Sequence, residues 1–177
     1  MKFPKNEIPL EVLREYLHYD PATGHLTWAK KLSVKVVVGK RAGTQVRNRD
    51  NRIIKIFGEV YIEHRLIWFY VTGVWPKKNE HIDHIDHDEA NNSWENLRLV
   101  SQAENNKNLS KRSTNSSGVM GVWINKRNLK NPYVAEIWEN GHKRSKGFPN
   151  LASAIYCRKS WETELNFHPN HGINKPT

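Results

Sequence analysis

Residues 80 to 97 have the composition of a cation-binding site. Between Glu80 and Leu97 there is no Lys or Arg, and six of the chain's 18 acidic residues lie there, although the formal net charge of the chain is +10. Imidazoles and amides accompany these carboxylates at His81, His84, His87, Asn91, Asn92, Asn96, Asn105 and Asn106. The simplest interpretation is a divalent metal ion held where a phosphate chain will lie.

The spacing within this segment suits hydrolysis of a phosphodiester, which needs an activated water, a base and a cation. Asp83 and Asn105 offer hard oxygen ligands, which suit Mg²⁺ or Mn²⁺. His84, with an ordinary pKa near 6.5, is the candidate base. Neighbouring strand residues point to opposite faces, so we expect a bend or bulge that brings Asp83 and His84 to one cleft.

Other interpretations of these residues stay open. Asn106 or Asn108 can replace Asn105 as a ligand. A zinc site can be assembled instead from His81, His84, His87, Asp86 and Asp88. Arg65 and Arg98 suit a phosphate, but they suit the nearby acids equally well.

The elements expected around the site alternate strands with short helices. We expect a helix from Pro9 along a stripe that includes Leu13 and Leu17, strands at 25–28, 53–57 and 60–62, and a buried helix over 64–72 that ends at Gly73. A strand at 81–85, a loop at 86–95 and a strand at 97–100 follow. Ser101 and Glu104 form a capping box that starts a helix at Gln102.

The sequence pattern of the C-terminal part indicates a second small domain, which follows a polar, Ser- and Asn-rich linker. Strands are expected at 119–124, 133–138 and 143–148, with a hairpin turn at Asn140-Gly141 and a helix capped by Asn150. The fold class is therefore α+β, ending in a three-stranded antiparallel sheet packed on one helix. The outward face of that sheet is expected to present basic groups and aromatic rings to a DNA major groove.

Composition favours a polyanionic partner and disfavours a membrane. The chain has 177 residues, 28 Lys plus Arg and a pI near 9.7. It has no apolar run approaching 18 residues, and its first residues lack the apolar centre of a secretory signal. The lone Cys157 excludes an intramolecular disulfide and suits a reducing cytoplasm.

The motif residues Asp83-His84, Asn91-Asn92, Glu95-Asn96-Leu97 and Glu104-Asn105 resemble the HNH, or ββα-metal, endonucleases, and more narrowly those of the phage homing type. The similarity covers roughly residues 60 to 108 and includes His64-Arg65-Leu66 upstream. It implies that Asp83 and Asn105 bind the metal, that His84 activates water, and that Asn96 fixes the loop and orients the base. It further implies 5′-phosphate and 3′-hydroxyl products.

Residues 118 to 165 resemble the ethylene-response-factor, or APETALA-type, DNA-binding domain of plants. The similarity rests on the Gly and aromatic framework of Gly118-Val119-Met120-Gly121-Val122, Tyr133-Val134-Ala135, Asn140-Gly141 and Lys146-Gly147-Phe148, with Met120 where the plant pattern has Arg. We therefore expect DNA contacts from basic residues that precede this module and from basic and aromatic residues within it. The candidate DNA-contacting residues are Arg65, Arg98, Lys111, Arg112, Trp123, Lys126, Arg127, Tyr133, Trp138, Lys143, Arg144 and Lys146.

Together these patterns predict an α/β extension at 1–58, an HNH core at 59–108, a linker at 109–118 and a DNA-binding domain with its tail at 119–177. The expected function is metal-dependent cleavage of double-stranded DNA in the cytoplasm, that of the host cell if a phage encodes the chain. A monomer is expected to nick, and a homodimer to break both strands. The alternatives are a catalytically idle, sequence-specific DNA-binding protein or repressor, and an RNA-directed nuclease.

Overall fold

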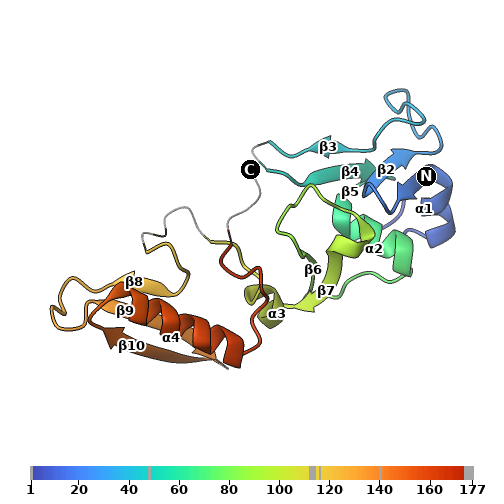
Figure 1. Cartoon of the computed structure of the whole chain (residues 1–177). Helices are drawn as coiled ribbons and strands as arrows, with labels where there is room; N and C mark the ends of the chain where they lie inside the picture. Colours follow the sequence, from blue (N-terminus) through green and yellow to red (C-terminus); the bar gives the residue numbers. More distant parts are fainter. Residues whose placement is uncertain (1, 48, 112–114, 116, 140, 174–177) are drawn as a thin grey trace. The chain divides into compact units, whose positions relative to one another are not determined.

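The computed structural model describes residues 2–47, 49–111, 115, 117–139 and 141–173. The chain forms two compact units, Met1–Asn105 and Asn106–Thr177, which we call the first and second units. Both combine short helices with small antiparallel sheets, so the predicted α+β class is confirmed (Figure 1).

The first unit contains most of the elements. In chain order they are α1 (Leu10–Tyr16), β1 (Leu17–Asp20), β2 (His25–Trp28), β3 (Thr44–Gln45), β4 (Arg52–Ile56), β5 (Glu59–Ile62), α2 (Glu63–Thr72), β6 (Glu80–His84), a short 3-10 helix at Trp94–Asn96, β7 (Leu97–Ser101) and α3 (Gln102–Asn106). The strands form the hairpin β1–β2, the sheet β3–β4–β5 and the hairpin β6–β7.

Strand β1 is the element that the sequence pattern missed. Leu17 fits the apolar stripe of the preceding helix, but the helix ends at Tyr16 and Leu17 pairs with Trp28 across the β1–β2 hairpin. Leu17 is fully buried, and it would be buried in a helix as well as in a strand. The apolar pattern alone therefore does not distinguish the two. The pairing partner, eleven residues later, decides in favour of the strand.

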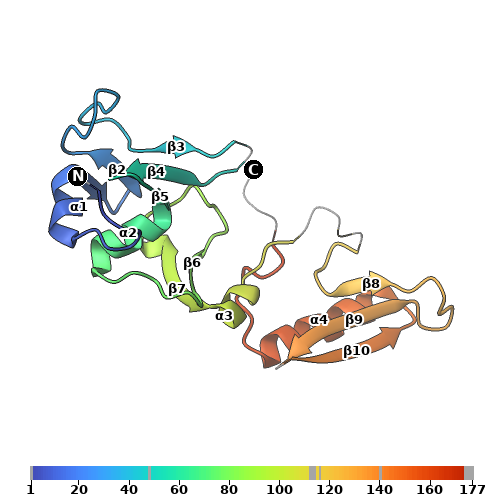
Figure 2. The same cartoon turned by 180° about the vertical axis from the view of Figure 1, so that it is seen from behind.

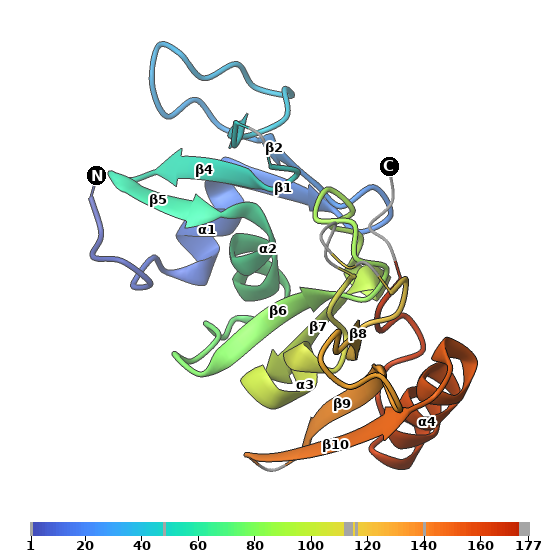
Figure 3. The same ribbon diagram turned by 90° about the vertical axis from the view of Figure 1, so that its left-hand side faces the viewer.

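Helix α2 is the centre of the first unit. It packs against β4 and β5 on one side and β6 on another, and Figure 3 shows it between the β3–β4–β5 sheet and β6. As predicted, it is buried and ends at Gly73, whose φ of 73° is the left-handed conformation that glycine adopts readily. The helix begins with Glu63, an acidic residue that is buried with it.

Strands β6 and β7 and helix α3 follow the predicted strand, loop, strand, helix order. The capping box forms as expected, because Glu104 N–H donates to Ser101 Oγ at 3.2 Å and Ser101 N–H donates to Glu104 Oε2 at 2.8 Å. These reciprocal bonds fix the start of α3, on which Asn105 lies.

The second unit is a three-stranded antiparallel sheet, ordered β10–β9–β8, with one helix. Its elements are β8 (Val122–Ile124), β9 (Tyr133–Glu139), β10 (His142–Phe148) and α4 (Leu151–Glu164). Helix α4 covers one face of the sheet, which is seen from opposite sides in Figures 1 and 2. Asn150 caps α4 as predicted, accepting a hydrogen bond from Ser153 N–H at 2.8 Å.

Residues 107 to 111 span the end of the predicted HNH core and the start of the predicted linker, and they belong to the second unit. The carbonyls of Lys107 and Leu109 accept hydrogen bonds from His168 and Gly172, and Lys111 N–H donates to Ile173. The hairpin turn predicted at Asn140-Gly141 includes Asn140, which lies outside the described residues.

Candidate active site

Asp83 and His84 are the last two residues of β6, and the strand is regular there. Asp83 pairs with Arg98 and His84 with Leu97 in a one-to-one register along β7. The bend or bulge expected from the sequence is therefore not found in this ladder, and the two side chains leave the strand on opposite faces. His84 shares the buried face with Ile82.

His84 lies in a buried chain of polar groups. Its side chain is 6% exposed, and Nε2 lies 2.9 Å from Oδ1 of Asn92. Asn92 Nδ2 donates to Glu63 Oε2 at 3.0 Å, and Arg41 Nη2 donates to the same oxygen at 3.2 Å. We call these four residues the His84 network.

The chemistry of this network determines which ring nitrogen of His84 carries a proton. An ionised carboxylate only accepts hydrogen bonds, so the amide NH₂ of Asn92 must face Glu63 and its oxygen must face His84. That oxygen also only accepts, so His84 Nε2 must be the donor. The neutral imidazole then has its proton on Nε2, and Nδ1 is the basic nitrogen.

Histidine 64, on α2, packs edge-on against the His84 ring with centroids 5.1 Å apart. Burial lowers the pKa of His64 to about 3, and the nearby charges of His84 and Arg65 contribute to the shift. His64 is therefore neutral at physiological pH. It contacts the candidate base as an aromatic ring rather than as a charge, in agreement with the packing role that its helical position suggests.

Asn96 organises the loop between the two strands. Its Oδ1 accepts from Asp86 N–H at 3.0 Å, and its Nδ2 donates to Asp86 Oδ1 at 2.9 Å and to the Asn91 carbonyl at 2.8 Å. These bonds close the loop on itself, as a loop-fixing residue requires. Asn96 is linked to the candidate base through the backbone: Ile85, the residue after His84, donates its N–H to the Asn96 carbonyl.

Asp83 is held by Arg98, whose Nε and Nη2 donate to Asp83 Oδ2 at 2.9 and 2.7 Å. Of the two roles considered for Arg98, the structure shows the one with the nearby acid. The donor set of Asp83 and Asn105, one carboxylate and one amide, fits a hard cation such as Mg²⁺ in type. Asn105 is half-buried and lies on α3, directly after β7.

The zinc alternative is not supported. In the described part of the chain, no three His, Cys, Asp or Glu side chains are grouped so as to hold a metal ion. Two members of the proposed set stabilise the loop instead: Asp86 accepts from Asp88 N–H, and Asp88 accepts from Ala90 N–H. His87, with a φ of 69°, occupies a left-handed turn position.

The predicted DNA-contacting residues of the second unit lie on both faces of its sheet. Because paired residues share a face, Trp123, Trp138 and Lys143 point away from α4. Trp138 is 62% and Trp123 is 41% exposed. Glu136 lies between them, accepting from Trp123 Nε1 at 3.3 Å and from Lys143 Nζ at 2.6 Å. Lys126 and Arg127 are exposed in the segment before β9.

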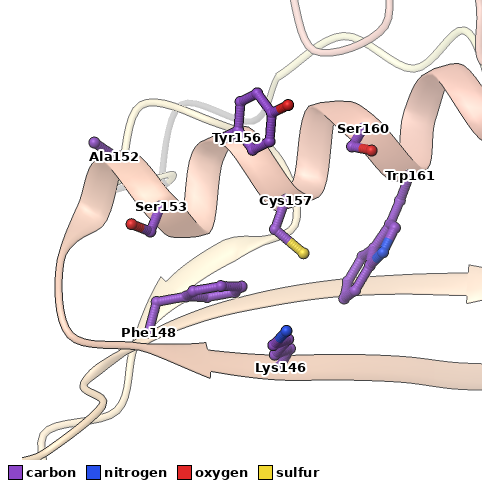
Figure 4. Close-up of a pocket in the computed structure, with 8 residues that line it drawn as sticks. All are labelled: Lys146, Phe148, Ala152, Ser153, Tyr156, Cys157, Ser160 and Trp161. Atoms are coloured by element: carbon purple, nitrogen blue, oxygen red, sulfur yellow. The ribbon is translucent and has the colours of Figure 1, made fainter.

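The register corrects the expectation of one outward surface for the whole set. Tyr133, Arg144 and Lys146 share register with the residues that face α4. Arg144 pairs with Glu164 at 3.0 Å, and its guanidinium lies 4.7 Å from the centre of the Trp161 ring. Lys146 lines an open groove of about 620 Å³ between β10 and α4 (Figure 4).

The remaining candidates are dispersed. Arg65 donates to the Pro76 carbonyl at 3.2 Å, so its guanidinium supports the segment after α2. Lys111 donates to the Gly118 carbonyl at 3.3 Å, and Arg112 lies outside the described residues.

Sequence reasoning missed Glu63 and Arg41 and gave Asn92 no role. The available signal was an acidic residue at the start of an otherwise apolar, buried helix, because a buried carboxylate requires a polar partner. Tyr19, also missed, donates to the Asn92 carbonyl at 2.8 Å. Burial raises the pKa of Tyr19 to about 12, helped by Asp20 and Glu63, so its hydroxyl remains a donor.

Comparison with known proteins gives one family match and one curated relative, and no solved structure matches. Residues 61–107 match the family model described as HNH endonuclease, a span that contains Asp83, His84, Asn96 and Asn105. A curated relative, Protein 3.8 of Escherichia phage T7, is 31% identical over 94 residues, which cover 52% of this chain and 77% of the relative. No helix in the described ranges is long and apolar enough to cross a membrane. The chain is therefore a homologue of Protein 3.8 and belongs to the HNH endonuclease family through its domain at residues 61–107.

Proposed function

We propose that the chain is a metal-dependent, homing-type DNA endonuclease in which His84 is the general base. The observation that carries the proposal is the His84 network, which holds a buried imidazole with Nε2 bonded to Asn92 within the HNH domain. A base must have its lone pair available before the substrate arrives. With Nε2 as the donor to Asn92, the neutral form of His84 has its lone pair on Nδ1.

In the proposed reaction, His84 Nδ1 takes a proton from a water molecule as its oxygen attacks the phosphorus. The bond from phosphorus to the 3′ oxygen breaks, and the departing 3′ oxygen takes a proton from solvent water, so the products are a 5′-phosphate and a 3′-hydroxyl. His84 then carries protons on both nitrogens, and Asn92 Oδ1 stays bonded to Nε2 throughout. Asn96 holds the loop that contains Asn92, through its bond to the Asn91 carbonyl.

Asp83 and Asn105 would hold the divalent ion, Mg²⁺ or Mn²⁺. Because Asp83 and His84 leave β6 on opposite faces, the proposal requires the end of this strand to distort when substrate and ion bind. When bound, the ion supplies positive charge next to the charge that develops on the phosphate. Arg98 is the present cationic partner of Asp83, so metal binding requires Arg98 to share that carboxylate or to leave it. An Arg98 that leaves becomes available to a DNA phosphate.

We further propose that the second unit is an APETALA-type DNA-binding module that reads duplex DNA with the face opposite α4. Trp123, Trp138 and Lys143 lie on that face, and their exposure supports the assignment. Glu136 keeps Lys143 close to the sheet until a phosphate competes for it. Arg144 and Lys146 are candidates only for a contact along the β10 edge.

The test is cleavage of supercoiled plasmid carrying the target, with Mg²⁺ and with EDTA. We expect the protein to produce nicked circles with Mg²⁺ but not with EDTA. The cleavage rate of His84→Ala should be about 10² to 10⁴-fold lower than that of wild type. His81→Ala is the matched control, because His81 lies on the same strand outside the His84 network. Equal rates for His84→Ala and wild type would remove His84 from the mechanism.

Two further outcomes separate the alternatives. Tight binding of the target without any metal-dependent nick favours an idle DNA-binding protein. Faster cleavage of RNA than of duplex DNA favours an RNA-directed nuclease.

A further inference from the structure

The positive charge of the chain is concentrated in one short segment of the first unit. Residues 30 to 55 contain nine Lys and Arg against Asp50 alone, a net charge of +8 in a chain whose net charge is +10. This segment is neither the HNH domain nor the second unit. It consists of the loop that precedes β3 and the β3–β4 hairpin.

Three of the nine cations serve the fold. Lys30 pairs with Glu15, Arg41 pairs with the buried Glu63, and Arg52 donates to the Gly43 carbonyl at 2.8 Å. The other six are exposed, and within the described residues none of them forms an ion pair with a carboxylate. They are Lys31, Lys35, Lys40, Arg47, Arg49 and Lys55, and we call them the basic hairpin surface.

Strand alternation and the loop place these side chains on the solvent side of the sheet. Lys55 lies between Ile54 and Ile56, both fully buried, so it must point outward. Lys35, from the loop, and Lys55 line the same hollow of about 590 Å³. Arg47 and Arg49 line a second hollow of about 370 Å³ at the end of the hairpin. Figure 3 shows the loop and β4 as an outer layer of the first unit.

The segment is also tied to the candidate base. Arg41 anchors it to Glu63, which orients Asn92 and through it His84. The β3–β4 contact is close, because a Cβ on Gly43 would lie 2.3 Å from the Ile53 carbonyl oxygen. A ligand held by the basic hairpin surface is therefore held at a fixed place relative to the HNH domain.

We propose that the basic hairpin surface binds the phosphate backbone of duplex DNA and holds the substrate on the nuclease unit independently of the second unit. A group of exposed cations without carboxylate partners suits a polyanion. The contacts are with phosphates and carry no base preference. The proposal goes beyond the nuclease assignment and concerns binding alone, so it stands or falls separately from the role of His84.

An anionic lipid surface is the rival partner. Val34, Val37 and Val38 are exposed in the same loop, and apolar side chains among lysines also suit a membrane interface. DNA is favoured because the surface belongs to the unit that contains the HNH endonuclease domain.

The experiment compares two full-length variants with the same loss of charge. In the first, Lys35, Lys55, Arg47 and Arg49 are all changed to Gln; in the control, Lys2, Lys5, Lys77 and Lys78, which are exposed elsewhere in the first unit, are changed to Gln. Binding to a duplex without the target sequence is measured in EDTA, so that no cleavage occurs, at several salt concentrations. Vesicles containing phosphatidylserine are the lipid probe.

Each lost phosphate contact reduces the slope of log affinity against log salt by about 0.9. We expect the first variant to lose about three to four units of slope and the control to lose less than one. Equal slopes for the two variants, whether both unchanged or both reduced, overturn the proposal. It is also overturned if the first variant loses vesicle binding while its DNA slope is unchanged. If the wild type fails to cut DNA but the slopes differ as expected, the inference holds and the nuclease mechanism fails.

Discussion

A single amide, Asn92, determines which ring nitrogen of His84 donates the hydrogen bond inside the His84 network. Asn92 is 1% exposed and has no alternative partner in water, so its orientation is set by the carboxylate of Glu63 on one side. The consequence for His84 is chemical: with Nε2 donating to Asn92, the neutral imidazole has its lone pair on Nδ1. In the proposed mechanism, Glu63 positions His84 through Asn92.

We therefore predict that Glu63→Gln disturbs the tautomer of His84. A glutamine can present either oxygen or nitrogen to Asn92, so the amide is no longer forced to face one way. The imidazole ¹⁵N chemical shifts should change from the Nε2-protonated pattern to a mixture, and cleavage should slow by roughly tenfold. Glu59→Gln, on β5 outside the network, is the control and should leave both unchanged. An unmixed Nε2-protonated spectrum in Glu63→Gln contradicts the positioning role.

Asp86 makes the stability of the loop depend on pH. Burial acts to raise the pKa of Asp86, but hydrogen bonds from Asn91, from Asp88 N–H and from Asn96 outweigh it and lower the pKa. A carboxyl with a lowered pKa stabilises the fold above its ordinary value near 4, and this contribution is lost as the pH falls through the lowered pKa.

Asp86→Asn should destabilise the protein at pH 7 by about 1–3 kcal/mol, because Asp88 N–H and the amides of Asn91 and Asn96 lose an ionised acceptor. Its melting temperature should also fall less steeply than that of wild type as the pH is lowered below about 4. Glu95→Gln, an exposed residue of the same loop region, is the matched control. Parallel pH curves for wild type and Asp86→Asn would show that this carboxylate is not responsible.

At the scale of elements, the β1–β2 hairpin supports the loop of the active site. Its turn approaches residues 92 to 94 closely, since Trp94 N–H donates to the Pro21 carbonyl and Tyr19 donates to the Asn92 carbonyl. Gly24, with a φ of 70°, is the point of closest approach: a Cβ there would lie 2.2 Å from the Asn92 carbonyl carbon. Backbone atoms cannot yield as a flexible side chain can.

Gly24→Ala should therefore displace the loop that carries Asn92. We expect the free energy of unfolding to fall by well over about 1 kcal/mol. Because the displaced loop carries Asn92, the His84–Asn92 hydrogen bond should weaken and cleavage should slow. The control is Gly39→Ala, which has a similar φ of 81° but nothing within 4 Å of the added Cβ. The difference between the two variants in thermal unfolding measures the contact rather than the backbone strain. Equal melting temperatures would show that the hairpin does not hold the loop.

What the sequence predicted at this scale depended on local signals. The capping box of Ser101 and Glu104 and the alternation of β9 involve neighbours along the chain, and both elements formed where expected. Leu17 and Glu63 depended on partners far away. Leu17 fits a helix or a strand until Trp28 pairs with it, and nothing near Glu63 in sequence indicates that Arg41 and Asn92 will meet it.

The same contrast applies to the candidate site. The residue types at Asp83, His84, Asn96 and Asn105 indicated the chemistry, and the HNH family match covers all four. Their surroundings were not predictable, because the ion pair of Asp83 with Arg98 and the burial of His84 arise from strand register and tertiary packing. Arg144 was expected on the outward face of the sheet, but its pairing with Ile137 places it on the face toward α4.

At the scale of the whole molecule, each unit has a core of its own. The core of the second unit is small, with Ala135, Ile137 and Trp161 at its centre. Gly121 lies directly before β8 and opposite Glu136 of β9. Gly121 has a φ of 70°, and its carbonyl accepts from Glu136 N–H at 2.7 Å. A Cβ there would lie 2.3 Å from Arg158 Nε and 2.5 Å from the Glu136 carbonyl oxygen.

Gly121→Ala should therefore unfold the second unit at a lower temperature while the first unit keeps its stability. If recognition belongs to the second unit and chemistry to the first, DNA affinity should fall at least tenfold, whereas single-turnover cleavage at saturating DNA should stay within about twofold of wild type. Gly118→Ala, with a φ of 81° and no atom within 4 Å of the added Cβ, controls for backbone strain. A cleavage rate that falls in step with affinity, even when all the DNA is bound, would mean that the second unit takes part in the chemistry and not only in holding the substrate.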